Sequence, residues 1–222
     1  MAEEAQPFVD ALPERTGAQP PTLPGSAQAW SLQLPGDERE LILVRSGIGL
    51  VAAASALAAV LTQVRPGTVV SAGTTGGLGR QVEVGDVCAS ANLAYTDADA
   101  TAFGYVRGQT PGQPETFAGD PALLDRLERV GPAALRSATA SSGSAQLHVG
   151  QMLAGNSFIT AANVTDTREV FPTALSTDME STALAQVAAN AGIPFVSVRG
   201  VSDLCGPEAG QDFHIAGEEA AA

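Results

Sequence analysis

The 222-residue sequence contains no lysine: all eleven basic residues are arginine, against 24 acidic residues and a net charge of −13. Without a side-chain amine, Schiff-base chemistry and a phosphate-binding P-loop are excluded, because both need lysine. The shortage of positive charge argues against nucleic acid and against an anionic membrane surface, since both attract a basic footprint. The acidic surface otherwise supports solubility and says little about the fold.

Cysteine, histidine and long apolar runs are also scarce. Cys88 and Cys205 are far apart and have no CxxC partner, which favours two buried thiols in a reducing compartment over a disulfide. His148 and His214 lack metal-ligand spacing, so we expect neither a metal site nor a cofactor. The acidic N-terminus has no apolar signal core, and no run approaches the ~20 apolar residues of a spanning helix. These shortages predict a cytoplasmic protein.

The order of the predicted elements indicates the fold class. Apolar residues make up 45% of the sequence, enough for a folded chain, and we expect one domain over residues 1–222. Helices and near-continuously apolar strands alternate, which favours an α/β domain with a partly parallel sheet covered on both faces. We predict helices at 50–64, 120–131 and 181–192, and strands at 40–49, 68–77, 82–95 (with a hairpin), 137–148, 150–159 and 194–204.

Two polar segments form the ends of predicted strands, which is where ligands bind in open α/β sheets. The glycines of "AGTTGG" (72–77) allow backbone N–H groups to approach a ligand, but the spacing fits no nucleotide motif and a tight turn is the better interpretation. In "VRGVSDL" (198–204), Asp203 beside Ser202 could act as an acid or base, although a loop Asp is at least as common.

The segment "STDMESTALAQ" (176–186) contains Asp178 and Glu180, the two charged residues between Glu169 and Arg199. Thr177-x-x-Glu180 matches a capping box, in which Glu180 would reach back to the Thr177 backbone and Asp178 would only favour the helix dipole. A catalytic role is the alternative. The sequence has no G-x-S-x-G elbow and suggests no Cys–His pairing, so carboxylates are the available acid–base groups.

Several segments together carry a resemblance to a known family. They include "SGIG", "AGTTGGL", "YTDADATAFGYVRGQTPG", "FITAANV", "TDMESTALAQVA" and "PFVSVRGVSDL", and extend from residue 1 to about Phe213. In these segments the chain resembles the 5′-methylthioadenosine/S-adenosylhomocysteine nucleosidases, within the nucleoside phosphorylase family. The resemblance implies a single α/β domain with three layers, in which helices flank a central mixed, twisted sheet.

The resemblance also implies a reaction, the hydrolysis of the N-glycosidic bond of 5′-methylthioadenosine and S-adenosylhomocysteine with release of adenine. Adenine leaves poorly unless its N7 is protonated, so one carboxyl group must stay neutral at about pH 7. By resemblance that acid is Asp203, oriented by Ser202. Glu4 would take a proton from water on the opposite face of the sugar. Glu180, steadied by Arg199, would bind the ribose hydroxyls.

Further contacts with the nucleoside are implied in the same way. Met179 would pack under the ribose, and Thr74 would contact the attacking water. Phe158 would stack on the purine, and the backbone of Ile159 would meet the purine edge.

The 5′ substituent and a second subunit complete the site that the resemblance implies. Ile48 and Phe213 would line the 5′-thioalkyl pocket. Phe103 and Pro111 would reach into the partner's pocket, which implies a homodimer with composite sites, acting in methionine salvage.

The chain also departs from the family pattern. The family usually has an apolar first strand before the segment that starts at Met1 and a C-terminal helix after the region of Phe213; both appear missing, so we expect a version extended at both ends to be more stable and more active. Three other functions stay open: action on another 5′-substituted adenosine (aminodeoxyfutalosine-like), phosphorolysis, and nucleoside binding without catalysis. The absence of a basic residue in "SAGTTGG" favours water over phosphate.

Overall fold

The computed structural model describes residues 1–139, 142–206 and 220. A six-stranded mixed sheet is the centre of the fold, with the strand order β5-β4-β6-β7-β3-β8. β8, the last strand of this order, pairs in parallel with β3 and also antiparallel with β4, which lies next to the other end. The strands are β3 (Val69–Gly77), β4 (Val87–Tyr95), β5 (Phe117–Ala118), β6 (Leu147–Ala154), β7 (Ala174–Asp178) and β8 (Phe195–Asp203).

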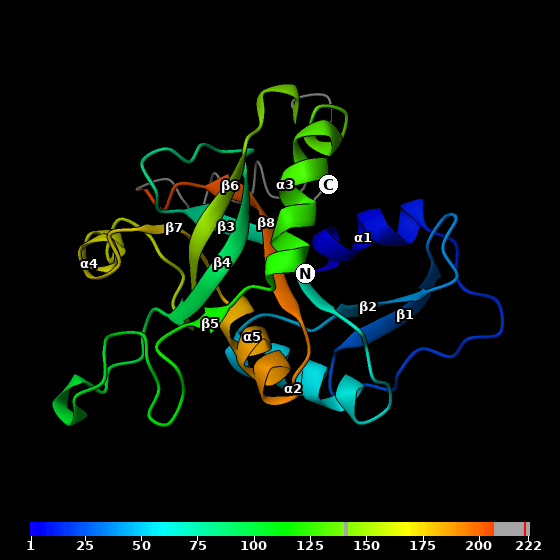
Figure 1. Cartoon of the computed structure of the whole chain (residues 1–222), viewed down its shortest axis with the longest axis horizontal. Coiled ribbons are helices and arrows are strands. Elements are labelled where there is room, and N and C mark those ends of the chain that lie inside the picture. Colours follow the sequence, from blue (N-terminus) through cyan, green and yellow to red (C-terminus); the bar gives the residue numbers. More distant parts are fainter. Residues whose placement is uncertain (140–141, 207–219, 221–222) are drawn as a thin grey trace.

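Helices flank this sheet, as the resemblance implied (Figure 1). α3 packs on β4, β6 and β8, while α2 and α5 lie side by side away from α3. β1 and β2 form a separate antiparallel pair, and α1 contacts both β2 and β3. The bounds are α1 (Ala2–Ala11), β1 (Gln28–Gln33), β2 (Glu40–Arg45), α2 (Leu50–Leu61), α3 (Pro121–Leu135), α4 (Val164–Val170) and α5 (Ser181–Asn190), with short 3₁₀ turns at Thr101–Phe103 and Ser142–Ser144.

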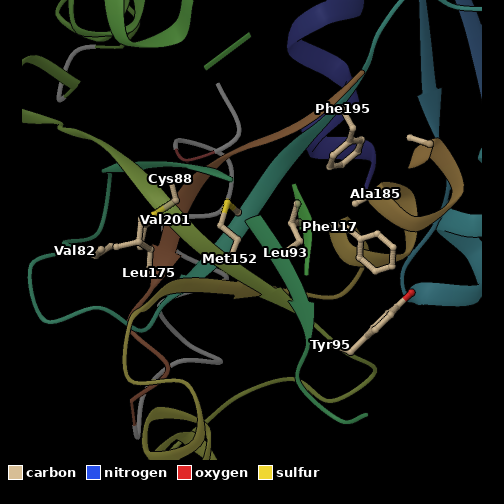
Figure 2. Close-up of a cluster of buried hydrophobic side chains, with 11 residues drawn as sticks. Val82, Cys88, Leu93, Tyr95, Phe117, Met152, Leu175, Ala185, Phe195 and Val201 are labelled. Carbon is tan, nitrogen blue, oxygen red and sulfur yellow. The ribbon is translucent and has the colours of Figure 1, made fainter. Parts of the chain in front are cut away.

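The main core joins α5 to the sheet. Figure 2 shows side chains of β4, β6 and β8, including Leu93, Met152 and Val201, gathered in one cluster that also contains Ala185 of α5. Burial of side chains of this size contributes about 1.5–3 kcal/mol each. The N-terminal end of α5 is therefore held firmly beside the strand ends, where the functional site lies.

Two predicted boundaries were wrong because a glycine was taken as the end of a helix or strand. Residues 137–148 and 150–159 were expected to be two strands, but the structure has one strand, β6. Gly150 lies inside it, where an added Cβ would come within 2.8 Å of Leu175 on β7. Helix α3 likewise runs past Gly131 to Leu135. An added Cβ at Gly131 would lie 2.9 Å from Leu147, so glycine is needed there for packing. Both glycines allow close packing.

The tight turn expected over residues 72–77 was wrong, because these residues belong to strand β3 and pair with β8. The other differences concern elements without a strong local pattern. Residues 82–95 contain the single strand β4 and no hairpin, since its antiparallel partner β5 comes from residues 117–118. The helices α1 and α4 and the fully buried strand β7 were not predicted. The Asp120 N-cap of α3 is confirmed, accepting hydrogen bonds from two backbone N–H groups. Within the described part of the chain no helix is long and apolar enough to cross a membrane, and Cys88 and Cys205 are buried free thiols.

Candidate active site

The ends of β3, β7 and β8 meet at a cavity of about 1060 Å³. The Thr75 hydroxyl donates to the Thr177 carbonyl at 2.9 Å, which ties β3 to β7, and β3 pairs with β8 along its length. Side chains of β2, α2 and β3 line the rest of the cavity, and most of them are apolar. Most residues predicted for the site line this one cavity, namely Glu4, Ile48, Thr74, Phe158, Ile159, Met179, Glu180, Arg199, Ser202 and Asp203.

Arg199 is the buried centre of the polar end of the cavity. The residue is 4% exposed, and its guanidinium lies among oxygen acceptors of β3 and of the start of α5. Nε donates to the Ser181 hydroxyl at 3.0 Å, Nη2 to the Ser71 hydroxyl at 2.9 Å, and Nη1 to the Thr74 carbonyl at 2.9 Å. Nη1 also donates to Glu180 at 3.2 Å. A buried cation needs this complete set of partners, because leaving it uncompensated would cost several kcal/mol, about 3–5.

The structure contradicts the capping-box interpretation of Glu180. Helix α5 begins at Ser181 with Glu180 as its N-cap residue, and the Glu180 side chain makes no cap hydrogen bond. It reaches into the cavity instead, where its carboxylate accepts the Gly49 N–H at 2.9 Å and the bond from Arg199. Asp178 closes the turn, because its Oδ1 accepts the N–H groups of Glu180 and Ser181, both at 2.7 Å.

Glu4 reaches the same cavity from α1. Its Oε1 accepts the backbone N–H of Thr74 at 2.8 Å and the Thr74 hydroxyl at 3.0 Å. Its other oxygen contacts the amino group of Met1. Burial alone would raise the pKa of Glu4, but Arg199, the amino terminus and the Thr74 N–H together bring that pKa below its ordinary value of 4.5. Glu4 is therefore an ionised carboxylate at neutral pH.

Gly73 makes room for Glu4, since its φ is +151° and an added Cβ would lie 2.4 Å from Glu4 Oε1 and 3.2 Å from Arg199 Nη1. We expect Gly73→Ala to displace the Glu4 carboxylate and lower turnover on the order of a hundredfold, as a shift of about 1 Å in a catalytic group does. Gly17→Ala is the matched control, because Gly17 also has a positive φ, +78°, and an added Cβ there meets no atom of the described residues within 4 Å. Unchanged turnover in Gly73→Ala would show that this contact does not hold Glu4.

Glu180 has the opposite titration behaviour. Burial raises its pKa above 4.5, Arg199 opposes this, and the negative charges of Asp178 and Glu4 raise it further, while the Gly49 N–H lowers it. The two glutamates thus share one arginine. Glu4 also has the Thr74 donors, whereas Glu180 has the Asp178 charge beside it.

Thermal midpoints measured between about pH 7 and about pH 4 test these two directions. The lowered pKa of Glu4 contributes stability that is full above 4.5 and is lost as the pH falls through the folded-state value. The raised pKa of Glu180 contributes stability that is full below 4.5 and is lost as the pH rises through its folded-state value. On acidification the wild type should therefore lose stability relative to Glu4→Gln and gain it relative to Glu180→Gln. Differences of the same sign for both variants would contradict the assignment.

Asp203 ends β8 and is 1% exposed. One carboxyl oxygen accepts the Ser202 hydroxyl at 3.0 Å and the other accepts the Cys205 N–H at 2.9 Å. Gly76 lies against it, since an added Cβ would come within 3.2 Å of Asp203 Oδ1 and 2.6 Å of the Cys205 sulfur. The carboxyl group is therefore fixed in one orientation at the edge of the cavity.

Comparison with known proteins assigns the family. The sequence profile of the phosphorylase superfamily matches residues 1–222. The chain belongs to this superfamily. A Staphylococcus aureus protein named 5′-methylthioadenosine/S-adenosylhomocysteine nucleosidase is 36% identical over 185 residues, which cover 83% of this chain and 77% of that protein.

Solved structures of nucleosidases with the same name are also similar to this superfamily member. The Neisseria meningitidis nucleosidase of that name, in complex with methylthio-immucillin-A, has a TM-score of 0.88 at 30% identity, covering 100% of this chain and 90% of that one. The Colwellia psychrerythraea nucleosidase in complex with adenine also has a TM-score of 0.88, at 32% identity, covering 100% and 86%.

Two predicted site residues of this phosphorylase-superfamily chain, which were expected to reach a partner's pocket, lie outside its own cavity. Phe103 and Pro111 do not line the cavity, and the Phe103 side chain is 82% exposed on the loop after β4. Phe213 lies outside the described residues. Sequence reasoning missed two serines, Ser71 and Ser181, whose hydroxyl groups hold Arg199. Their only signal was a hydroxyl in an otherwise apolar or glycine-rich segment.

Proposed function

We propose that this protein hydrolyses the N-glycosidic bond of 5′-methylthioadenosine and of S-adenosylhomocysteine, releasing adenine and the thio-substituted ribose. Relatives that are 30–36% identical are named 5′-methylthioadenosine/S-adenosylhomocysteine nucleosidase, and the structures of two of them are in complex with methylthio-immucillin-A or adenine. The observation that carries the proposal is the ionised Glu4 carboxylate on the donors of Thr74, in the same cavity as Asp203.

Asp203 acts as the general acid. As the C1′–N9 bond breaks, its electron pair goes to adenine, and Asp203 delivers a proton to N7 so that neutral adenine leaves. The Ser202 hydroxyl keeps the carboxyl group in position. General acid catalysis of this kind contributes about 10²–10⁴-fold.

Glu4 acts as the general base. The water oxygen bonds to C1′ on the face opposite the departing adenine, and its proton goes to Glu4, as in inverting glycosidases. The lowered pKa keeps Glu4 ready to accept this proton at neutral pH. The Thr74 hydroxyl, already in contact with the Glu4 carboxylate, helps to orient the water.

Glu180 binds the ribose hydroxyls and offsets the positive charge that develops on the sugar. Its attachment to Arg199 and to the Gly49 N–H supports this role, because both contacts fix the carboxylate without covering it. Met179 packs under the ribose, and Phe158, which lines the cavity, stacks on the purine with the Ile159 backbone at its edge.

Phosphorolysis is the less well supported alternative. A phosphate ion beside Thr74 of β3 would have to replace or face the Glu4 carboxylate, which already occupies the N–H and hydroxyl donors of Thr74. The nearby Arg199 is engaged with Glu180, Ser181, Ser71 and the Thr74 carbonyl. A phosphate anion beside the Glu4 carboxylate would be repelled by it, so the site favours a neutral nucleophile, which is water.

The finer features of the proposal concern assembly and cellular setting. We include a homodimer, because an 82% exposed Phe103 is a costly side chain to leave in water and suits insertion, with Pro111, into a partner's site. Ile48, which lines the cavity, and Phe213 would border the 5′ substituent. We place the reaction in the cytoplasm and in methionine salvage.

A substrate panel tests the proposed function. We expect adenine release from 5′-methylthioadenosine and from S-adenosylhomocysteine, and slower release from an aminodeoxyfutalosine-like nucleoside. Release from the last substrate alone would reassign the substrate. Calorimetric binding of all three without release of base would leave a nucleoside-binding protein and overturn the proposal.

A further inference from the structure

Asp178 uses its two carboxylate oxygens for different contacts. Its side chain is 2% exposed, so it has almost no surface for a substrate. Oδ1 accepts the backbone N–H groups of Glu180 and Ser181, each at 2.7 Å. These two bonds fix the turn between β7 and α5, and this turn carries the Glu180 side chain into the cavity.

The second oxygen faces the arginine. Asp178 Oδ2 lies 3.4 Å from Arg199 Nε and accepts no hydrogen bond from the described residues. Nε donates instead to Ser181, whose hydroxyl also bonds those of Ser197 at 2.8 Å and Ser71 at 3.1 Å. The serine hydroxyls therefore orient the guanidinium through hydrogen bonds, and Asp178 adds a buried negative charge beside it.

We propose that Asp178 is a positioning residue for the nucleosidase reaction: it fixes the turn that carries Glu180 and holds Arg199 so that one guanidinium nitrogen engages both Glu180 and the Thr74 carbonyl. That nitrogen, Nη1, lies 3.2 Å from Glu180 and 2.9 Å from the Thr74 carbonyl. It thus links the ribose-binding carboxylate to the part of strand β3 that holds Glu4. The catalytic part of this inference rests on the proposed function.

The charges around Glu180 give the inference a readout besides the rate. Glu180 is faced by Arg199 of β8, Asp178 of β7, Glu4 of α1 and the Gly49 N–H before α2. Asp178 raises the pKa of Glu180, so replacing its charge with a neutral group should lower that pKa. A residue that only formed the turn would leave it unchanged.

The test compares Asp178→Asn with the wild type. Asparagine keeps one oxygen for the two backbone N–H groups but places an amide against Arg199. We expect kcat/KM to fall on the order of tenfold to a hundredfold. The Glu180 carboxyl, followed by NMR in protein labelled with ¹³C in the glutamate carboxyls and assigned with Glu180→Gln, should titrate at lower pH. A wild-type rate with an unshifted titration would overturn the inference.

Asp86→Asn is the matched control. Asp86 is also a buried carboxylate that accepts two backbone N–H groups, from Glu83 at 3.0 Å and Gln146 at 2.8 Å, but it does not line the active-site cavity. We expect it to leave the Glu180 titration unchanged. If Asp178→Asn fails to fold, Asp178→Ser keeps a short acceptor for the turn without the charge, and the same two results are expected of it.

A double mutant separates positioning from an independent effect. Because Asp178 acts through Glu180 and Arg199, adding Asp178→Asn to Glu180→Gln should lower the rate little further. Losses that multiply would overturn the inference. The titration is measured on the unliganded protein, so a wild type that released no adenine would refute the proposed function and still leave the Asp178 contact tested.

Discussion

Asp203→Asn is expected to lower kcat for adenine release by roughly 10²–10⁴-fold and to leave the protein folded. Asparagine has the shape of aspartic acid, and its one carbonyl oxygen can still accept the Cys205 N–H or the Ser202 hydroxyl, each of which the carboxyl group accepts in the wild type. It cannot deliver an acidic proton to N7. Steady-state release of adenine, with the thermal midpoint as a check of folding, measures the effect.

A leaving group that needs no proton provides the control for Asp203→Asn. With a 4-nitrophenyl 5-methylthioriboside, the nitrophenolate departs unaided, so the variant should recover most of the wild-type rate. An equal loss on both substrates would mean that Asp203 supports the site without acting as an acid.

Glu4→Gln is expected to cause a loss of similar size, roughly 10²–10⁴-fold in kcat. Glutamine can still accept the N–H and hydroxyl of Thr74 through its carbonyl oxygen, but it cannot remove a proton from water. KM should change much less, because the proposed role of Glu4 is in the reaction step and not in holding the nucleoside.

Two measurements sharpen the Glu4 result. Glu3→Gln, which neutralises the exposed neighbour on α1, should have the wild-type rate. Azide, a nucleophile with no proton to remove, should restore part of the Glu4→Gln rate and form a ribosyl azide. Full activity in Glu4→Gln would exclude the assignment of Glu4 as the base.

The fold was predictable where local patterns were strong. The alanine-rich helix α2, the apolar strands β3 and β8, and the N-cap of α3 followed from composition and spacing. Gly131 and Gly150 misled the prediction, because a glycine that relieves a close contact looks the same in sequence as one that ends an element. Strand β7 has no polar alternation, since all five of its residues are buried.

The site residues were likewise predictable where a local pattern marked them, and not where their partners come from distant segments. Asp203 and Arg199 could be recognised as polar residues at a strand end, and the family resemblance added Glu4. The local pattern around Glu180 pointed to a capping box, but its partners, Gly49 and Arg199, come from distant segments. The side chain that closes the start of α5 is Asp178 instead, because its Oδ1 accepts the N–H groups of both Glu180 and Ser181.

The surroundings of Glu4 and Glu180 explain why the pKa values of these two carboxyl groups shift in opposite directions. Arg199 is the cation they share, and Asp178, Glu180 and Glu4 all raise its pKa against the effect of burial. Burial, with the charge of Asp178 beside it, raises the pKa of Glu180, whereas Arg199, the amino terminus and the Thr74 N–H lower that of Glu4. Such an arrangement favours chemistry over stability.

The most direct test of the central claim is the reaction of the wild-type protein with 5′-methylthioadenosine, first without phosphate and then with it, with the sugar product identified by mass spectrometry. Hydrolysis predicts the same rate of adenine release in both buffers and free methylthioribose as the product in each. Release that depends on phosphate and yields methylthioribose 1-phosphate would contradict the account.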